Sequence, residues 1–66
     1  MKNRIAELRG EHGLTQQALA NELDVSRQTV ISLERGKYNP SILLAHKVAA
    51  LFGLSIEQVF IFEEDE

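Results

Sequence analysis

The chain contains no cysteine and no tryptophan, and it has one proline among its 66 residues. Without cysteine, neither a disulfide nor a thiolate metal site can support the fold. The two histidines, His12 and His46, cannot form a metal site without carboxylate ligands, so we expect packing or capping roles for them. A chain of this size buries only about 60% of its unfolded surface. Association between chains is therefore the support that remains.

Long apolar runs are also absent. No stretch approaches the roughly 20 apolar residues that a membrane span requires. The first ten residues carry four charges and no apolar core, unlike a signal peptide, so we expect a cytoplasmic protein. The sequence has no glycine-rich phosphate loop and no nucleophile–base pair. It therefore predicts neither an enzyme nor a bound cofactor or metal.

Positive charge is scarce overall, because seven Lys and Arg face ten Asp and Glu for a formal net charge of −3. The acidic tail, residues 63–66, alone contributes −4, and we expect it to be solvated. The first 62 residues hold seven basic and six acidic side chains, a net of +1. Within residues 26–47, four basic side chains face only Glu34. Such a local basic surplus is compatible with binding to nucleic acid.

The pattern of apolar and capping residues predicts five short helices. They lie at about residues 4–12, 16–23, 26–35, 42–52 and from residue 55 onward. Thr15 and Ser26 can cap the second and third helices, and Ser55 with Gln58 forms a capping box for the last. We predict one all-α domain over residues 1–66, with a small two-stranded ribbon between residues 1–3 and the C-terminus.

The second and third predicted helices are joined by about three residues, which is the spacing of a helix-turn-helix. The turn needs a residue that tolerates positive φ, and Asp24 is the candidate. Ala20 stands where the third helix must approach the second closely. Val30 and Leu33 would close the small core from the other side.

The stretch "LTQQALANELDVSRQTVISLERGKYNPS" resembles the Xre/Cro-type helix-turn-helix family, which includes the lambdoid phage repressors. The resemblance covers about Ile5 to Phe60. Within the family, the "SRQT…KYNPS" pattern is most similar to short regulators of the cytolysin-operon repressor type. The resemblance implies a five-helix lambda-repressor-like fold. It also implies a sequence-specific regulator of double-stranded DNA, most often a homodimeric repressor on a palindromic operator.

Three positions depart from the family pattern. The family usually has glycine where this chain has Asp24, and polar residues where it has Ile31 and Leu43. Two other functions use the same domain: a DNA-binding antitoxin that neutralises a toxin, and a control protein of a restriction system. No pocket is inferable in so small a core, so we expect no small-molecule effector.

The third helix, drawn at 100° per residue, directs Val30 and Leu33 to one side and a mainly polar set to the other. We expect this outward set to read bases in the major groove: Arg27, Gln28, Ile31 and Ser32. Arg suits guanine, Gln suits adenine, and an apolar side chain suits the thymine methyl. The resemblance matches Arg27, Gln28 and Ser32 with base-reading positions. The alternative is a capped, solvated first turn.

Phosphate contacts are expected on both sides of this helix. The loop "RGKYN" supplies cations, a phenol and an amide just past the helix end, which suits the DNA backbone. The resemblance adds a phosphate contact by Gln16 at the start of the second helix. The full set of predicted phosphate contacts is Gln16, Ser26, Thr29, Arg35, Lys37, Tyr38 and Asn39. The resemblance also implies a largely buried ion pair between Arg9 and Glu34.

The C-terminus is too apolar for a loose end, because residues 59–62 are four consecutive apolar residues. We expect residues of the segment 55–62 to form a dimer interface, since a core of this size can bury about two of the four. The predicted interface is Leu43, Leu54, Val59, Phe60, Ile61 and Phe62. The alternative is that these side chains cap the monomer core or pair with the N-terminal strand.

Overall fold

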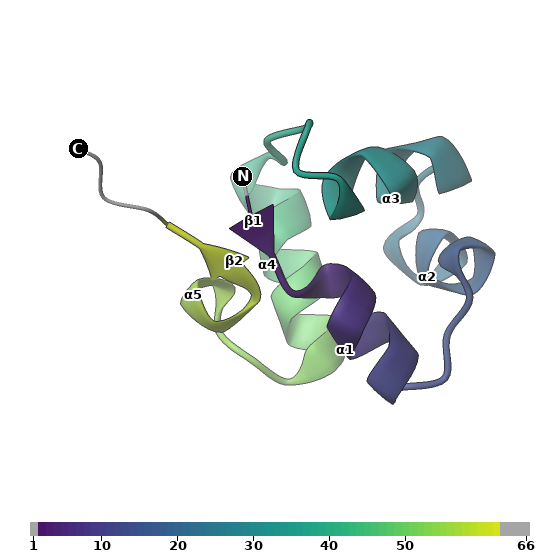
Figure 1. Cartoon of the computed structure of the whole chain (residues 1–66), viewed down its shortest axis with the longest axis horizontal. Helices are drawn as coiled ribbons and strands as arrows, with labels where there is room; N and C mark the ends of the chain where they lie inside the picture. The colour runs from purple at the N-terminus through teal and green to yellow at the C-terminus, as the bar shows by residue number, and fades with distance from the viewer. Residues whose placement is uncertain (1, 63–66) are drawn as a thin grey trace.

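The computed structural model describes residues 2–62; Met1 and the acidic tail at 63–66 lie outside the described residues. Five helices and a two-stranded ribbon fill a body of 36 × 22 × 20 Å (Figure 1). The elements are β1 (Lys2–Asn3), α1 (Ile5–Glu11), α2 (Gln16–Leu23), α3 (Arg27–Glu34), α4 (Ile42–Phe52), α5 (Ile56–Val59) and β2 (Phe60–Ile61). The predicted all-α fold with a small ribbon is confirmed. Within residues 2–62, no helix is long and apolar enough to cross a membrane.

Side-chain caps start four of the helices, as the sequence predicts for three of them. Thr15, Ser26 and Ser55 each accept a hydrogen bond from the backbone N–H three residues on, and Ser41 does the same for α4. The capping box at α5 is complete, because the Gln58 side chain also accepts from the Ser55 N–H at 2.8 Å. These bonds satisfy backbone donors that a helix start otherwise leaves without a partner.

The first helix begins at Ile5, one residue later than predicted. Arg4 has a non-helical backbone (φ −107°, ψ 20°), and its N–H donates to the Val59 carbonyl at 2.8 Å. Arg4 makes no side-chain cap, but Asn3 Oδ1 accepts from the Ile5 N–H at 3.0 Å and so satisfies the first backbone donor of α1. The pairing of the two chain ends therefore sets where α1 begins.

The core takes side chains from all five helices and from β2. Its buried members are Ile5, Leu8, Leu19, Ala20, Leu23, Val30, Leu33, Leu44, Ala45, Val48, Ala49, Phe52, Val59 and Phe60. Ala20 is fully buried, as expected from the close approach of α2 and α3. Strand β1 pairs antiparallel with β2, with Lys2 opposite Ile61 and Asn3 opposite Phe60.

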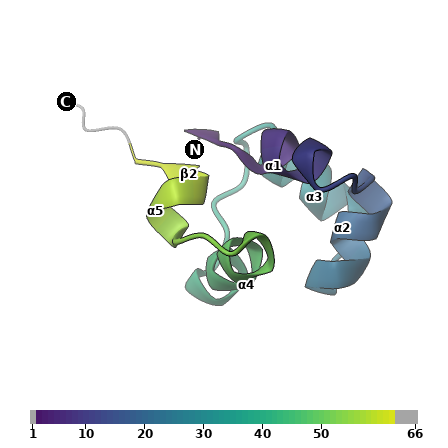
Figure 2. The ribbon, with the colours of Figure 1, turned by 90° about the horizontal axis from the view of Figure 1, so that it is seen from below.

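Two residues of the predicted dimer interface belong to the protomer's own core. Val59 and Phe60 have exposed fractions of 0% and 1%. Their placement in a dimer interface is wrong, because α5 and β2 turn both side chains inward against the helices. The ribbon and α5 lie at the opposite end of the molecule from α2 (Figures 1 and 2).

The turn between α2 and α3 takes the predicted form. Asp24 has φ 60° and ψ 44°, the left-handed conformation, and is the one non-glycine residue with positive φ in the described chain. The Val25 N–H donates to the Ala20 carbonyl at 3.0 Å and closes the turn. This backbone conformation is what brings α3 across α2.

Asp24→Val should lower the free energy of unfolding by about 1–2 kcal/mol, because a β-branched residue is disfavoured in the left-handed region. Asp24→Gly should stay within about 0.5 kcal/mol of the wild type, because glycine relieves the strain but gains entropy in the unfolded chain. Urea denaturation of the three proteins measures this. Equal stability of the Val variant would contradict the requirement for left-handed backbone at this turn.

Candidate nucleic-acid interface

The outward face of α3 carries the side chains that the sequence singled out. Arg27 and Gln28 are exposed, and Ile31 and Ser32 are half-buried. Val30 and Leu33, on the opposite side, are fully buried. An eight-residue helix with a buried apolar side and exposed Arg and Gln at its N-terminal end has the form of a major-groove reading helix. All four predicted base-reading residues therefore lie on one helix, with Arg27 and Gln28 in its first turn.

The hydroxyl groups at the start of α3 are already engaged with each other. Ser26 Oγ lies 2.9 Å from Thr29 Oγ1, and it also accepts from the Thr29 N–H at 3.1 Å. Two hydroxyls hold two protons, and one of them lies in the bond between the oxygens. The pair therefore retains one proton that can be donated outward, for example to a phosphate oxygen.

The loop after α3 is organised by the helix end itself. Gly36 has φ 73°, its N–H donates to the Leu33 carbonyl at 3.0 Å, and the Lys37 N–H donates to the Ser32 carbonyl at 3.2 Å. This pair of bonds is a Schellman motif, which stops a helix and turns the chain sharply. The side chains that it presents to solvent are Arg35, Lys37, Tyr38 and Asn39.

The structure contains the Arg9–Glu34 ion pair. Arg9 Nε lies 2.6 Å from Glu34 Oε2, and Arg9 Nη2 lies 3.5 Å from Glu34 Oε1. The exposed side-chain fractions are 22% for Arg9 and 9% for Glu34, so the pair is mostly shielded from water. Arg9 Nη1 also donates to the Leu14 carbonyl at 3.0 Å, which ties the α1–α2 connection to the same pair.

Gln16 joins this pair, which sequence reasoning did not anticipate. Its Nε2 donates to Glu34 Oε1 at 3.0 Å. A side-chain amide has two N–H donors, so one remains beyond the bond to Glu34. Glu34 therefore holds the Gln16 amide in a set orientation at the start of α2, where a helix N-terminus favours an anion.

Other polar residues have structural roles. Lys47, part of the basic surplus in the sequence, donates to the Leu23 carbonyl at 3.1 Å and so caps the end of α2. His12 Nδ1 lies 3.0 Å from the Leu8 carbonyl, and its ring is 5.0 Å from that of Phe52. Within residues 2–62, no three His, Asp or Glu side chains lie close enough to hold a metal ion.

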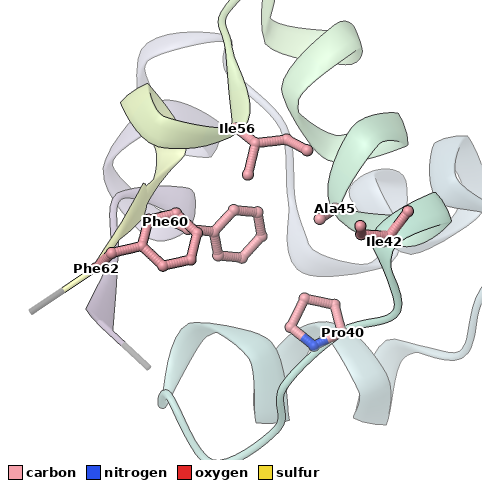
Figure 3. A pocket seen from close by; sticks show the side chains of 6 residues that line it. All are labelled: Pro40, Ile42, Ala45, Ile56, Phe60 and Phe62. Atoms are coloured by element: carbon pink, nitrogen blue, oxygen red, sulfur yellow. The ribbon is translucent and has the colours of Figure 1, made fainter.

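A second group of exposed side chains, on α4 and the C-terminal segment, is apolar. Of the predicted interface residues, Leu43 (67% exposed), Ile61 and Phe62 (58% exposed) reach solvent, whereas Leu54 packs half-buried on the core. Ile42 is 83% exposed, which the sequence did not reveal because the first turn of α4 is apolar all round. A groove of about 250 Å³ opens here (Figure 3). Its lining residues are Pro40, Ile42, Ala45, Ile56, Phe60 and Phe62.

The chain belongs to the helix-turn-helix family, because the family profile HTH_3 (Helix-turn-helix) matches residues 5–59. It is 54% identical over 66 residues to an uncharacterized HTH-type transcriptional regulator of Methanocaldococcus jannaschii, with 100% of each chain covered. It is 36% identical over 56 residues to the immunity repressor of Bacillus phage phi105, covering 85% of this chain and 39% of the repressor.

Among solved structures, the restriction-modification controller protein C.AhdI from Aeromonas hydrophila is similar, with a TM-score of 0.77, 33% identity and 86% of each chain covered. These comparisons confirm the resemblance to Xre/Cro-type regulators. The protein is a transcriptional regulator with a helix-turn-helix DNA-binding domain, and its family consists of regulators rather than enzymes.

An exposed ion pair on α1 offers a contrast with the shielded one. Arg4 Nη2 lies 3.1 Å from Glu7 Oε2, and both side chains reach solvent. The hydrogen bond and the charge of Arg4 lower the pKa of Glu7 from its ordinary value. The small stabilisation from this pair is present above the ordinary glutamate pKa and is lost as pH falls through the lowered one.

Glu34→Ala should lower the free energy of unfolding by about 3 kcal/mol, because it leaves the shielded Arg9 and the Gln16 amide without their acceptor. Glu34→Gln should lose less, because an amide oxygen can still accept from either group. Glu7→Ala is the matched control, with a much smaller expected change. Thermal or urea unfolding at pH 7 measures all three. A loss below about 0.5 kcal/mol in Glu34→Ala would place Arg9–Glu34 with ordinary surface pairs.

Proposed function

We propose that the protein is a cytoplasmic, homodimeric, sequence-specific repressor that places α3 in the major groove of a palindromic operator. The observation that carries the proposal is the division of α3 into a buried apolar side and an outward side with Arg27 and Gln28 exposed. An operator occupied in this way blocks access of RNA polymerase to the promoter. The similarity to a phage immunity repressor supports repression as the outcome.

Base recognition is assigned to the outward side of α3. Arg27 donates two hydrogen bonds to guanine O6 and N7, and Gln28 pairs with adenine N6 and N7. Ser32 and Ile31 are both half-buried and lie further along the helix. Their short side chains can contact only bases that lie close to the helix, and Ile31 is assigned to a thymine methyl. The first two residues carry most of the sequence preference, since each good bidentate pair discriminates by about 1–3 kcal/mol.

Contacts to the DNA phosphates are assigned to groups on both sides of α3. On one side are the second amide proton of Gln16 and the single outward proton of the Ser26–Thr29 pair. On the other are the exposed side chains of the loop after α3: Arg35, Lys37, Tyr38 and Asn39. Such contacts set register and affinity and make binding depend on salt.

A second copy of the chain is assigned to the apolar surface formed by Ile42, Leu43, Ile61 and Phe62. Two of them, Ile42 and Phe62, line the same groove, and exposed apolar side chains gathered in this way usually mark an interface. The groove volume of about 250 Å³ is below the usual range for small-molecule sites, which begins at about 300 Å³, so it suits inserted side chains better than an effector. A two-fold axis here would set two α3 helices about 34 Å apart, one turn of DNA.

A second candidate function is control of a restriction-modification system. The similarity to a restriction-modification controller protein over 86% of the chain favours it. The two functions share the DNA interface and differ in the genes that are controlled. A methyltransferase gene adjacent to the gene for this protein would support the second.

Arg27→Ala should weaken binding to the preferred operator by about 1–3 kcal/mol and relax the preference at one base pair per half-site. Arg27→Lys keeps the charge and should lose part of the same base preference, because the flexible Lys ammonium lacks the rigid planar fork of Arg. Selection of sites from random DNA, followed by titration of operator and unrelated DNA, measures both. Equal losses on both DNAs would show that Arg27 touches only phosphate.

Lys37→Ala should weaken binding to operator and unrelated DNA alike. The slope of log affinity against log salt should fall by about one per monomer, because one phosphate contact is lost. Titrations at several salt concentrations measure the slope, with Arg27→Lys as the charge-preserving comparison. A changed base preference with an unchanged slope would contradict the backbone role.

Phe62→Glu should give a folded monomer, because it places a charge in the proposed interface while the core residues remain. Affinity for a palindrome should fall by about 100-fold or more, since two half-sites no longer bind as one unit. Ala6→Glu adds the same charge at an exposed position of α1 and should remain dimeric. Sedimentation at micromolar concentration measures this. A wild-type monomer with full operator affinity would refute the dimer.

A further inference from the structure

One residue, Asn3, joins three separate parts of the molecule through its side chain and its backbone. Asn3 Oδ1 accepts from the Ile5 N–H at 3.0 Å, so it satisfies the first backbone donor of α1. Asn3 Nδ2 donates to the Leu33 carbonyl at 2.7 Å, thirty residues further along the chain. The backbone of Asn3 lies opposite Phe60 in the ribbon. The partly buried amide of Asn3 therefore contacts the start of α1 and the last turn of α3, while the backbone of the same residue pairs with the C-terminal segment.

The bond to Leu33 lies at the end of α3, where the loop with the proposed phosphate contacts begins. The Leu33 carbonyl also accepts from Gly36, within the Schellman motif that directs Arg35 and Lys37 outward. At 2.7 Å the Asn3 bond is at the short end of the range for N–H···O bonds. The Leu33 side chain is fully buried, so the core and Asn3 together hold this end of the helix.

The N-terminal segment is also bonded to the C-terminal segment, which carries part of the proposed dimer surface. The Arg4 N–H donates to the Val59 carbonyl at 2.8 Å, and Arg4 Nη1 donates to the Gln58 carbonyl at 3.3 Å. These bonds and the ribbon attach residues 2–4 to residues 58–61, directly before Phe62. Asn3 thus provides a polar connection between the C-terminal segment and α3.

We propose that Asn3 is a positioning residue that sets the placement of α3 relative to the dimer surface, and with it the spacing of the two half-sites. The inference rests on the proposed dimeric DNA binding. Its chemistry needs an amide at this position. Aspartate can accept from the Ile5 N–H but repels the Leu33 carbonyl, because a carboxylate only accepts. Serine can accept from the Ile5 N–H through an ST-turn, but its side chain is too short to reach Leu33.

The test uses a palindrome selected by the wild-type protein from random DNA, and versions of it with one base pair inserted or removed at the centre. Affinity for each DNA, and for an isolated half-site, is measured for wild type, Asn3→Ser and Asn3→Asp. Asn21→Asp makes the same amide-to-carboxylate change at an exposed position of α2, where its oxygen accepts from Gln17. Sedimentation and thermal unfolding are recorded for every variant.

Both Asn3 variants should reduce the preference for the selected spacing by about tenfold, the upper value for one lost hydrogen bond. Affinity for an isolated half-site should change little, and Asn21→Asp should keep the wild-type spacing preference. A purely structural role would lower the melting temperature and leave that preference unchanged. Folded, dimeric variants whose preference stays within about twofold of the wild type would overturn the proposal.

Failure of both variants to fold would also count against the proposal, because Asn3 would then serve stability rather than spacing. A wild-type protein that shows no preference among the spacings gives a different result. It would refute palindromic binding by a dimer, which is the proposed function itself, before any variant is compared.

Discussion

The ion pair between Arg9 and Glu34 is the contact on which the DNA face depends. Glu34 is the last residue of α3, and an unpaired carboxylate there would repel the phosphates that the neighbouring loop is suited to bind. Arg9 neutralises it through two N–H groups, and Gln16 donates a further hydrogen bond to the same carboxylate. The Glu34 carboxylate, which would otherwise repel phosphates, thereby joins α1, α2 and α3. The shielding of the pair makes this support strong only while both partners are present.

The order of the elements follows from local signals that a sequence displays directly. Caps at Thr15, Ser26 and Ser55 and the left-handed turn at Asp24 depend on residues within five positions of one another, so they were predictable. The two sides of α3 were predictable for the same reason, since helical periodicity separates Val30 from Arg27.

The features that escaped prediction depend on partners far along the chain. Periodicity cannot tell which face of the all-apolar first turn of α4 is covered, so the exposure of Ile42 was hidden. Nor can it show that Phe60 turns inward while Phe62 does not, because that depends on the pairing with β1. The bonds of Asn3 to Leu33 and of Gln16 to Glu34 each join different helices or strands. The fold family predicts where α3 lies, whereas these contacts decide how it is held.

The ribbon has a consequence for the order in which the elements fold. Lys2 pairs with Ile61, so the two-stranded sheet can form only when the two ends of the described chain come together. Closing a loop of this length is slow relative to forming α2 and α3, whose contacts are local. We therefore expect the two helices of the helix-turn-helix to form first, and the ribbon that joins the two ends of the described chain to form last.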